Sequence, residues 1–328
     1  MEVNINKLIN DIRNTVDAHK LGEGLYARVG TNGNLGPVNA YGCADAVNIL
    51  YTINQMPTDM AERAAMADGI CLFQNPEDGL FNEGSHVIEH GTAHCLAALE
   101  LLDAKPKYEV TGFDKYNTPE RMTEFLESLK FIEMKGSGHY GAGVFCSLFL
   151  SRRLTPETKK TFFDWLSSNV DKKYGMSKEG GIDAKLAPMW LHMGDWFHFL
   201  FCYHGAREPF PCKERLIDTC IMMYENDLLS DSFGRGQRFL EIDWAFSLYR
   251  AVIQCGYRYD ESMAILRRFA YDYANALISV DKQNDRAWND IHLLFGAVCA
   301  LSELQTAVPD VIRSDYPLRQ VLDRRPFI

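Results

Sequence analysis

Two kinds of helical segment alternate along the chain. Six segments are apolar almost all round and rich in Ala, Gly and Cys, which predicts helices that are buried on every side. They cover residues 41–53, 90–102, 139–150, 192–203, 241–253 and 290–304. Before each lies a segment with apolar residues on one face and charged residues on the other, a pattern typical of a surface helix. These segments cover residues 5–19, 60–73, 119–132, 156–170, 213–226 and 260–278.

The apolar segments recur at a nearly constant interval. Their first residues are Tyr41, His90, His139, His192, Glu241 and Asp290, and the successive differences are 49, 49, 53, 49 and 49. A fixed internal period indicates repeated structural units, here six helical hairpins. We therefore predict an all-α fold, a single (α/α)6 toroid over residues 1–328, with inner helices that start near residues 41, 90, 139, 192, 241 and 290. An open solenoid is the alternative, but neither terminal hairpin has the polar capping face that a solenoid needs.

Composition narrows the class of protein. The 328 residues are 47% apolar and 24% charged, which is typical of a globular protein with a large core. A net charge of −10 argues against a nucleic-acid partner. The N-terminus lacks the features of a signal peptide, and no apolar run is long enough for a membrane span. The nine cysteines are scattered and form no C-x-x-C motif, so we expect a reduced, cytoplasmic protein.

The connections into the apolar segments are long, and those out of them are mostly short. If the inner helices all start at one end of a ring, the long loops and the polar residues at the helix starts meet there and form a concave site. The residues concerned are Tyr41, Asp45, His90, His94, His139, Tyr140, His192, Asp195, Trp196, His198, Glu241, Asp243, Trp244, Asp290 and His292. Asp45, Glu241 and Asp290 could instead only cap helices, and a single buried histidine is often a core donor.

The stretch "HVIEH" (residues 86–90) matches the H-x-x-E-H pattern of some zinc proteases. Zinc binding by this pattern needs both histidines on one face of a helix. The 49-residue repeat, however, predicts that the inner helix begins near residue 90, which leaves His86 in a loop. We therefore expect no metal and no cofactor. The shortest alternative route to a metal site combines His90 or His94 with Asp195, Asp243 or His292 across the ring.

Two stretches resemble known toroid families. "LFQNPEDGLF" with "TAHCLAALELL" resembles the repeat of terpene cyclases and protein prenyltransferase β-subunits. "FGRGQRFLEIDWAFSLYRA" resembles the prenyltransferase stretch that supplies zinc ligands; Asp243 matches its aspartate, but Ala245 replaces its cysteine. The chain is also similar to bacterial proteins that share the "GLF…TAHC" segment and the "LDRRPFI" ending. As architecture, it resembles toroid glycosidases, unsaturated glucuronyl hydrolases and N-acylglucosamine-type epimerases. These resemblances imply the toroid fold.

The residues at the helix starts favour a sugar as substrate, because Trp and Tyr stack on sugar rings while His, Asp, Glu and Arg bind hydroxyl groups. We predict a glycoside hydrolase that acts on an oligosaccharide or an acidic sugar. Its catalytic carboxylates are expected to be Asp195 and Asp243, with Glu241 in reserve. Trp196 and Trp244 would stack on the sugar, the histidines would bind it, and Arg235 and Arg286 would recognise an acidic group.

Three alternatives stay open. The first is a sugar epimerase or lyase that moves a proton from carbon with His139 and Tyr140. The second is an isoprenoid enzyme related to the terpene cyclases and prenyltransferases. The third is a glycan-binding protein without catalytic activity.

Overall fold

A computed structural model describes residues 2–31, 34–82, 84–131 and 136–328. The described chain is mainly helical, which confirms the predicted all-α class. The inner helices are α2 (Ala40–Thr52), α4 (Ile88–Leu101), α6 (Gly138–Leu150), α8 (Met189–Ala206), α10 (Leu240–Cys255) and α12 (Ile291–Ala307). The outer helices are α1 (Asn6–Ala18), α3 (Met60–Cys71), α5 (Pro119–Ser128), α7 (Pro156–Asn169), α9 (Lys213–Glu225) and α11 (Tyr259–Ser279). Each inner helix starts within three residues of its predicted position.

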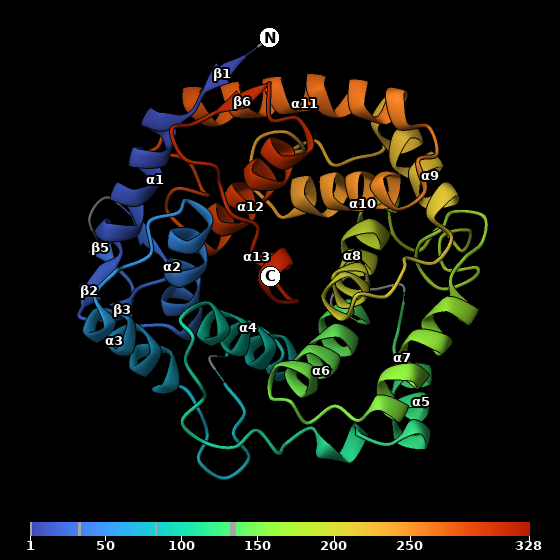
Figure 1. The fold of residues 1–328 in the computed structure, drawn as a ribbon, viewed down its shortest axis with the longest axis horizontal. Coiled ribbons are helices and arrows are strands. Elements are labelled where there is room, and N and C mark those ends of the chain that lie inside the picture. Colours follow the sequence, from blue (N-terminus) through green and yellow to red (C-terminus); the bar gives the residue numbers. More distant parts are fainter. Residues whose placement is uncertain (1, 32–33, 83, 132–135) are drawn as a thin grey trace.

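The inner helices contact one another in a cycle. Each packs against the next, and α12 packs against α2, so the contacts run α2–α4–α6–α8–α10–α12 and return to α2. Figure 1 shows these helices around the centre and the other six outside them. Nearly all residues of the inner helices are buried, whereas the outer helices bury one face. The apolar and amphipathic patterns of the sequence account for this difference.

Capping residues explain where several helices begin. Thr118 accepts a hydrogen bond from the Arg121 N–H at the start of α5, and Thr155 accepts one from the Thr158 N–H at the start of α7. Proline follows each threonine in the first turn, where it has no helical partner to lose. α5 ends at Ser128, so residues 129–131 of the predicted range 119–132 are not helical. Residue 132 lies outside the described residues.

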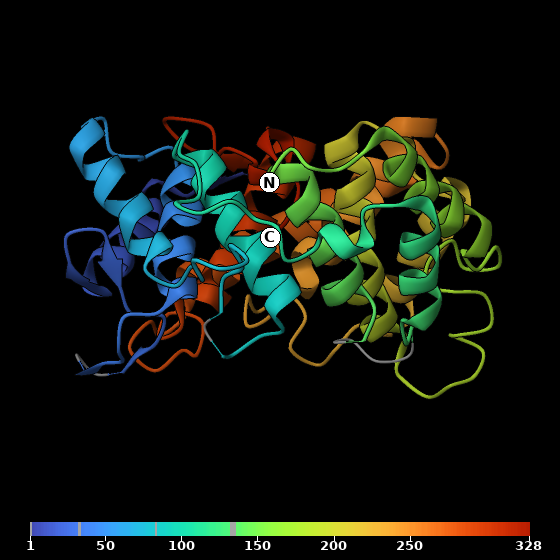
Figure 2. The same ribbon diagram turned by 90° about the horizontal axis from the view of Figure 1, so that it is seen from below.

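The strands are short, with two or three residues each. β1 (Val3–Asn4) pairs in parallel with β6 (Ile312–Arg313), with Val3 opposite Ile312. In the long connection before α2, β2 (Lys20–Gly22) pairs with β3 (Leu25–Tyr26), and β4 (Gly30–Thr31) pairs with β5 (Asn34–Leu35), both antiparallel. A 3₁₀ turn, η1 (Asp114–Tyr116), precedes α5. In Figure 2 the long connections lie along the lower edge of the molecule, at the end where the inner helices begin.

Residues 321–328 enter the ring after α12. They begin with the short helix α13 (Val321–Arg324), which Figure 1 shows at the centre. The Arg325 guanidinium donates to the backbone carbonyl of Ala97 at 3.0 Å and to the side-chain oxygen of Asn48. Phe327 is completely buried and has a positive φ of 91°, a strained value for a bulky residue. We call residues 321–328 the central segment.

Among the described residues, none of the helices combines the length and the apolar run that a lipid bilayer would require.

Candidate functional site

A cavity of about 370 Å³ lies where the inner helices begin. Among the described residues, its wall contains five histidines, three arginines and a single side-chain carboxyl group, with aromatic rings between them. These residues are His86, His90, His139, His198, His292, Arg28, Arg238, Arg286, Asp243, Trp190, Phe197 and Phe239. Of the predicted site residues, His90, His139, His198, Asp243, Arg286 and His292 are therefore brought together. We call this space the histidine cavity.

Three of its histidines converge on one point. A ring nitrogen from each of His90, His139 and His198 lies within 4.8 Å of the others. The planes of the rings are inclined to one another by 50–54°. Nδ1 of His198 donates to the carbonyl oxygen of Gly194 at 2.7 Å, which leaves Nε2 as the nitrogen with a lone pair. Phe327 of the central segment packs edge-on against His90, with ring centroids 4.7 Å apart.

A second group lies behind the first and is held together by hydrogen bonds. Asp45, which is completely buried, accepts from Nε2 of His94 at 2.9 Å and from Nδ1 of His292 at 3.1 Å. Burial alone would raise the pKa of Asp45, but the two imidazoles outweigh burial and hold that pKa well below its usual range. Asp45 is therefore ionised, and it orients His292 with Nδ1 toward the carboxylate.

Rings from α2, α4 and the loop before α4 form a column. The Tyr41 ring stacks against His86 at 4.3 Å and against His94 at 4.6 Å between centroids, with nearly parallel planes. The Tyr41 hydroxyl lies 2.5 Å from Nδ1 of His90. Because α4 begins at Ile88, the H-x-x-E-H pattern straddles the start of a helix, as predicted. His90 lies with His139 and His198, and His94 with Asp45 and His292.

The three predicted carboxylates have different surroundings. Asp243 lines the cavity, and burial, reinforced by the nearby Glu241, raises its pKa well above the usual range. Asp195 does not line the cavity, because its oxygens accept from the Ser137 hydroxyl and from the Gly138 N–H at 2.6 Å. Burial raises the pKa of Asp195 to about 7, although these hydrogen bonds oppose the shift.

Glu241 holds a loop. One of its oxygens accepts from the backbone N–H groups of Gly234 at 2.8 Å and Gly236 at 3.2 Å. Burial raises the pKa of Glu241 to about 6, and these N–H groups limit the shift. The predicted pair of catalytic carboxylates, Asp195 and Asp243, is therefore not assembled at the cavity wall, and Glu241 does not replace Asp195 there.

The two predicted stacking tryptophans are in the core instead. Trp244 donates Nε1 to the carbonyl oxygen of Cys220 at 2.9 Å and stacks against Tyr224 of α9. Trp196 is also buried and lies against Phe199. Each tryptophan directly follows an aspartate on its helix, so it points about 100° away from that aspartate. Trp190 lines the cavity, with the Arg238 guanidinium 5.6 Å from its ring centroid.

The other predicted residues lie outside the cavity wall. His192 is buried, with Nδ1 3.0 Å from the Ser177 hydroxyl, and Tyr140 is half-buried against the core. Asp290 caps α12 through the His292 N–H and forms an ion pair with Arg28 at 3.0 Å. Arg235 is exposed on the loop that Glu241 holds.

Sequence reasoning missed Arg28, His86, Trp190 and Arg238 as lining residues. Arg28, His86 and Arg238 lie in the long connections, and Trp190 lies in the first turn of α8. Their signal was the composition of those loops: aromatic and basic residues directly before the apolar segments. The structure also adds Ile328, from the central segment.

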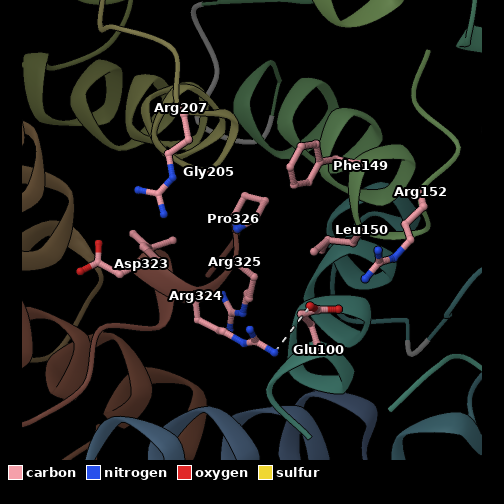
Figure 3. A pocket seen from close by; sticks show the side chains of 11 residues that line it. Glu100, Phe149, Leu150, Arg152, Gly205, Arg207, Asp323, Arg324, Arg325 and Pro326 are labelled. Carbon is pink, nitrogen blue, oxygen red and sulfur yellow. Dashed lines mark ion pairs between the residues drawn. The ribbon is translucent and has the colours of Figure 1, made fainter. Parts of the chain in front are cut away.

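A second cavity, of about 340 Å³, lies at the opposite end of the ring, where the inner helices end. Figure 3 shows Arg152, Arg207, Arg324 and Arg325 around it, with the Arg324–Glu100 contact drawn as a dashed line. Residues 322–326 of the central segment form part of its wall. We call this space the arginine cavity.

Comparison with models of protein families matched none, and comparison with curated proteins found no significant relative.

Proposed function

We propose that the chain forms an (α/α)6 toroid in one domain and that it is an enzyme that cleaves a glycosidic bond in an acidic sugar. The cyclic contacts of the inner helices, including the contact between α12 and α2, support the toroid. The location of the histidine cavity at the end with the long connections supports its use as the substrate site.

One observation carries the enzymatic proposal: an acid and a base line the same cavity. Asp243 is a carboxyl group whose burial favours the protonated form. His292 has Nδ1 held by the ionised Asp45, so Nε2, on the opposite edge of the ring, carries the lone pair. General acid–base catalysis requires such a pair, with one group ready to give a proton and the other ready to take one.

The arginines support an anionic substrate. Arg238 and Arg286 lie in the cavity wall together with Arg28, whose charge is matched by Asp290. Among the side chains of the described lining residues, the only carboxyl group is that of Asp243, whose burial favours the neutral form. A substrate carboxylate would therefore meet excess positive charge, while Trp190 offers a flat apolar surface for a sugar ring.

The reaction that fits these groups best is β-elimination. Nε2 of His292 takes the proton from the carbon next to the sugar carboxylate, and the electron pair of that C–H bond forms a C=C bond. The C–O bond to the leaving sugar breaks, and its oxygen receives the proton of Asp243. This reaction needs no second catalytic carboxylate.

Hydrolysis is the second candidate. Here His292 takes a proton from a water molecule that attacks the anomeric carbon, and Asp243 protonates the leaving oxygen. The raised pKa of Asp243 supports this route equally, but a hydrolase of the two-carboxylate type would also need an ionised carboxylate in the wall.

The test is to incubate the chain with uronate-containing oligosaccharides and matched neutral ones. Elimination produces ultraviolet absorbance from the new conjugated C=C bond, whereas hydrolysis releases reducing ends without it. We expect Asp243→Asn and His292→Asn each to lower kcat/KM about 10²- to 10⁴-fold, and Arg286→Gln to raise KM. Arg235→Gln is the matched control, because Arg235 is an exposed loop arginine outside the wall.

Two results would contradict the proposal: binding of acidic sugars without turnover, or full turnover by Asp243→Asn. Cleavage of neutral sugars in preference to acidic ones would overturn the substrate assignment alone.

A further inference from the structure

We infer that His90, His139 and His198 together bind a divalent transition metal ion of the Zn²⁺ type in the wall of the histidine cavity. The binding itself is independent of the proposed function. Only the role of the ion toward the substrate, described below, rests on it.

The first support is the arrangement of the rings. Tetrahedral Zn²⁺ binds imidazole nitrogens at about 2.0–2.1 Å, which places neighbouring ligand nitrogens about 3.3 Å apart. The three nitrogens lie within 4.8 Å of one another, so a small inward movement of each ring is enough. The ring planes are inclined to one another by 50–54°, which allows the three rings to surround a common centre. The Tyr41 column, in contrast, has nearly parallel rings.

The second support is the availability of the lone pairs. The hydrogen bond from His198 Nδ1 to the Gly194 carbonyl leaves Nε2 unprotonated, and in the part of the chain that the structure describes Nε2 has no hydrogen-bond donor. The Tyr41 hydroxyl contacts Nδ1 of His90, on the other side of that ring from Nε2. Metal-binding histidines usually have such a partner on the second nitrogen, which sets the tautomer and the orientation of the ring.

The neighbouring group of Asp45, His94 and His292 does not qualify. Its short distances are hydrogen bonds: both imidazoles give an N–H to Asp45. An ion there would have to replace these bonds in a fully buried position.

The chemistry of the ligands selects the type of ion. Neutral imidazole is a preferred ligand of Zn²⁺, Co²⁺ and related ions, whereas Mg²⁺ and Ca²⁺ prefer oxygen ligands. Three protein ligands that face a cavity leave a fourth position open, as in catalytic zinc sites. Under the proposed function, the substrate carboxylate would occupy that position, and the ion would withdraw charge from it while His292 removes the neighbouring proton.

The test uses the full chain after treatment with a chelator and dialysis, with Co²⁺ as the probe. We expect one Co²⁺ per chain, with the intense visible absorption of four- or five-coordinate cobalt rather than the weak absorption of the hydrated ion. Zn²⁺ should abolish this spectrum by displacement. Three exchangeable, paramagnetically shifted imidazole N–H signals should appear in the proton NMR spectrum, one for each ligand.

Variants then locate the ion. His139→Gln and His198→Gln should each weaken Co²⁺ binding more than about 100-fold, since the loss of an outer partner alone typically costs 10- to 100-fold. Tyr41→Phe keeps the buried ring and should weaken binding roughly 10-fold. His86→Gln and His292→Asn are matched controls: both residues line the same cavity but lie outside the group, and both variants should bind Co²⁺ normally.

The inference is overturned if the wild-type chain does not bind Co²⁺, or if His139→Gln and His198→Gln bind it as tightly as the wild type. If a ligand variant does not fold, the wild-type stoichiometry and the Tyr41→Phe affinity still decide the question. Because Co²⁺ binding is measured without substrate, its failure leaves the sugar assay untouched. Stoichiometric Co²⁺ binding without any acidic-sugar turnover would contradict the proposed function alone.

Discussion

The two ends of the ring use charge in different ways. At the arginine cavity, Arg250 of α10 forms a two-point ion pair with Glu303 of α12 and also contacts Asp323 of the central segment at 3.0 Å. Arg324 binds Asp103 at 2.9 Å. These ion pairs of Asp323 and Arg324 join the central segment to the surrounding helices.

At the other end, polar atoms are buried without partners. Among the described residues, Nε2 of His192, Oδ1 of Asp243 and Oε2 of Glu241 have none. Such groups cost free energy of folding unless a water molecule or an ion binds them. At the arginine end, Nη1 of Arg325, Nδ2 of Asn48 and Oγ of Ser147 also lack partners among the described residues. The ends therefore differ in their ion pairs, which tie the central segment to the helices at one end, while the proposed substrate site lies at the other.

The largest effect is expected from Arg250→Ala. Removal of the guanidinium leaves Glu303 buried and unpaired, which should lower the free energy of unfolding by about 3–5 kcal/mol. Urea denaturation measures this. The double variant Arg250→Met with Glu303→Leu should recover most of the loss, because it leaves no buried charge. A loss below about 1 kcal/mol for Arg250→Ala would contradict a structural role for this end.

At the histidine end a change in the opposite direction is expected from Glu241→Gln. The pKa of Glu241 is about 6 in the folded chain and near 4.5 when unfolded, so the folded state holds the proton longer. Stability is therefore lost as the pH rises from about 4.5 through 6. The difference corresponds to about 2 kcal/mol.

The glutamine variant avoids this loss and keeps an oxygen for the Gly234 and Gly236 N–H groups. It should be up to about 2 kcal/mol more stable than the wild type at pH 8 and equal to it at pH 4. Thermal unfolding over this pH range measures the difference. If the two proteins unfolded at the same temperature at every pH, burial would not raise the pKa of Glu241.

The smallest effect is expected from Arg324→Gln. Both partners of the Arg324–Asp103 pair are substantially exposed, and exposed pairs contribute only about 0–1 kcal/mol. The loss should be below about 0.5 kcal/mol and should vanish in high salt, as equilibrium unfolding at two salt concentrations would reveal. A loss as large as that of Arg250→Ala would mean that the whole arginine end acts as one network.

Whether a predicted residue lies at the cavity depends on the direction in which its side chain leaves the helix. His90 and His94 are four residues apart and both point inward, and Tyr41 and Asp45 do the same on α2. Trp196 and Trp244 are each one residue beyond an aspartate, and both point into the core. Their residue types suggested a sugar platform, but the helical rotation of about 100° per residue decides what each side chain meets.

By itself, the sequence determined the helices, their alternation and the end of the ring at which the polar helix starts gather. The helices depend on local periodicity and capping, and their alternation depends on the 49-residue repeat, which is visible in the order of the residues. Only the tertiary structure decided that His90, His139 and His198 from three helices converge. The same holds for the retreat of Asp195 from the cavity and for the entry of residues 321–328 into the ring. Such contacts join residues far apart in the chain and depend on the rotation and packing of whole helices, which no local pattern specifies.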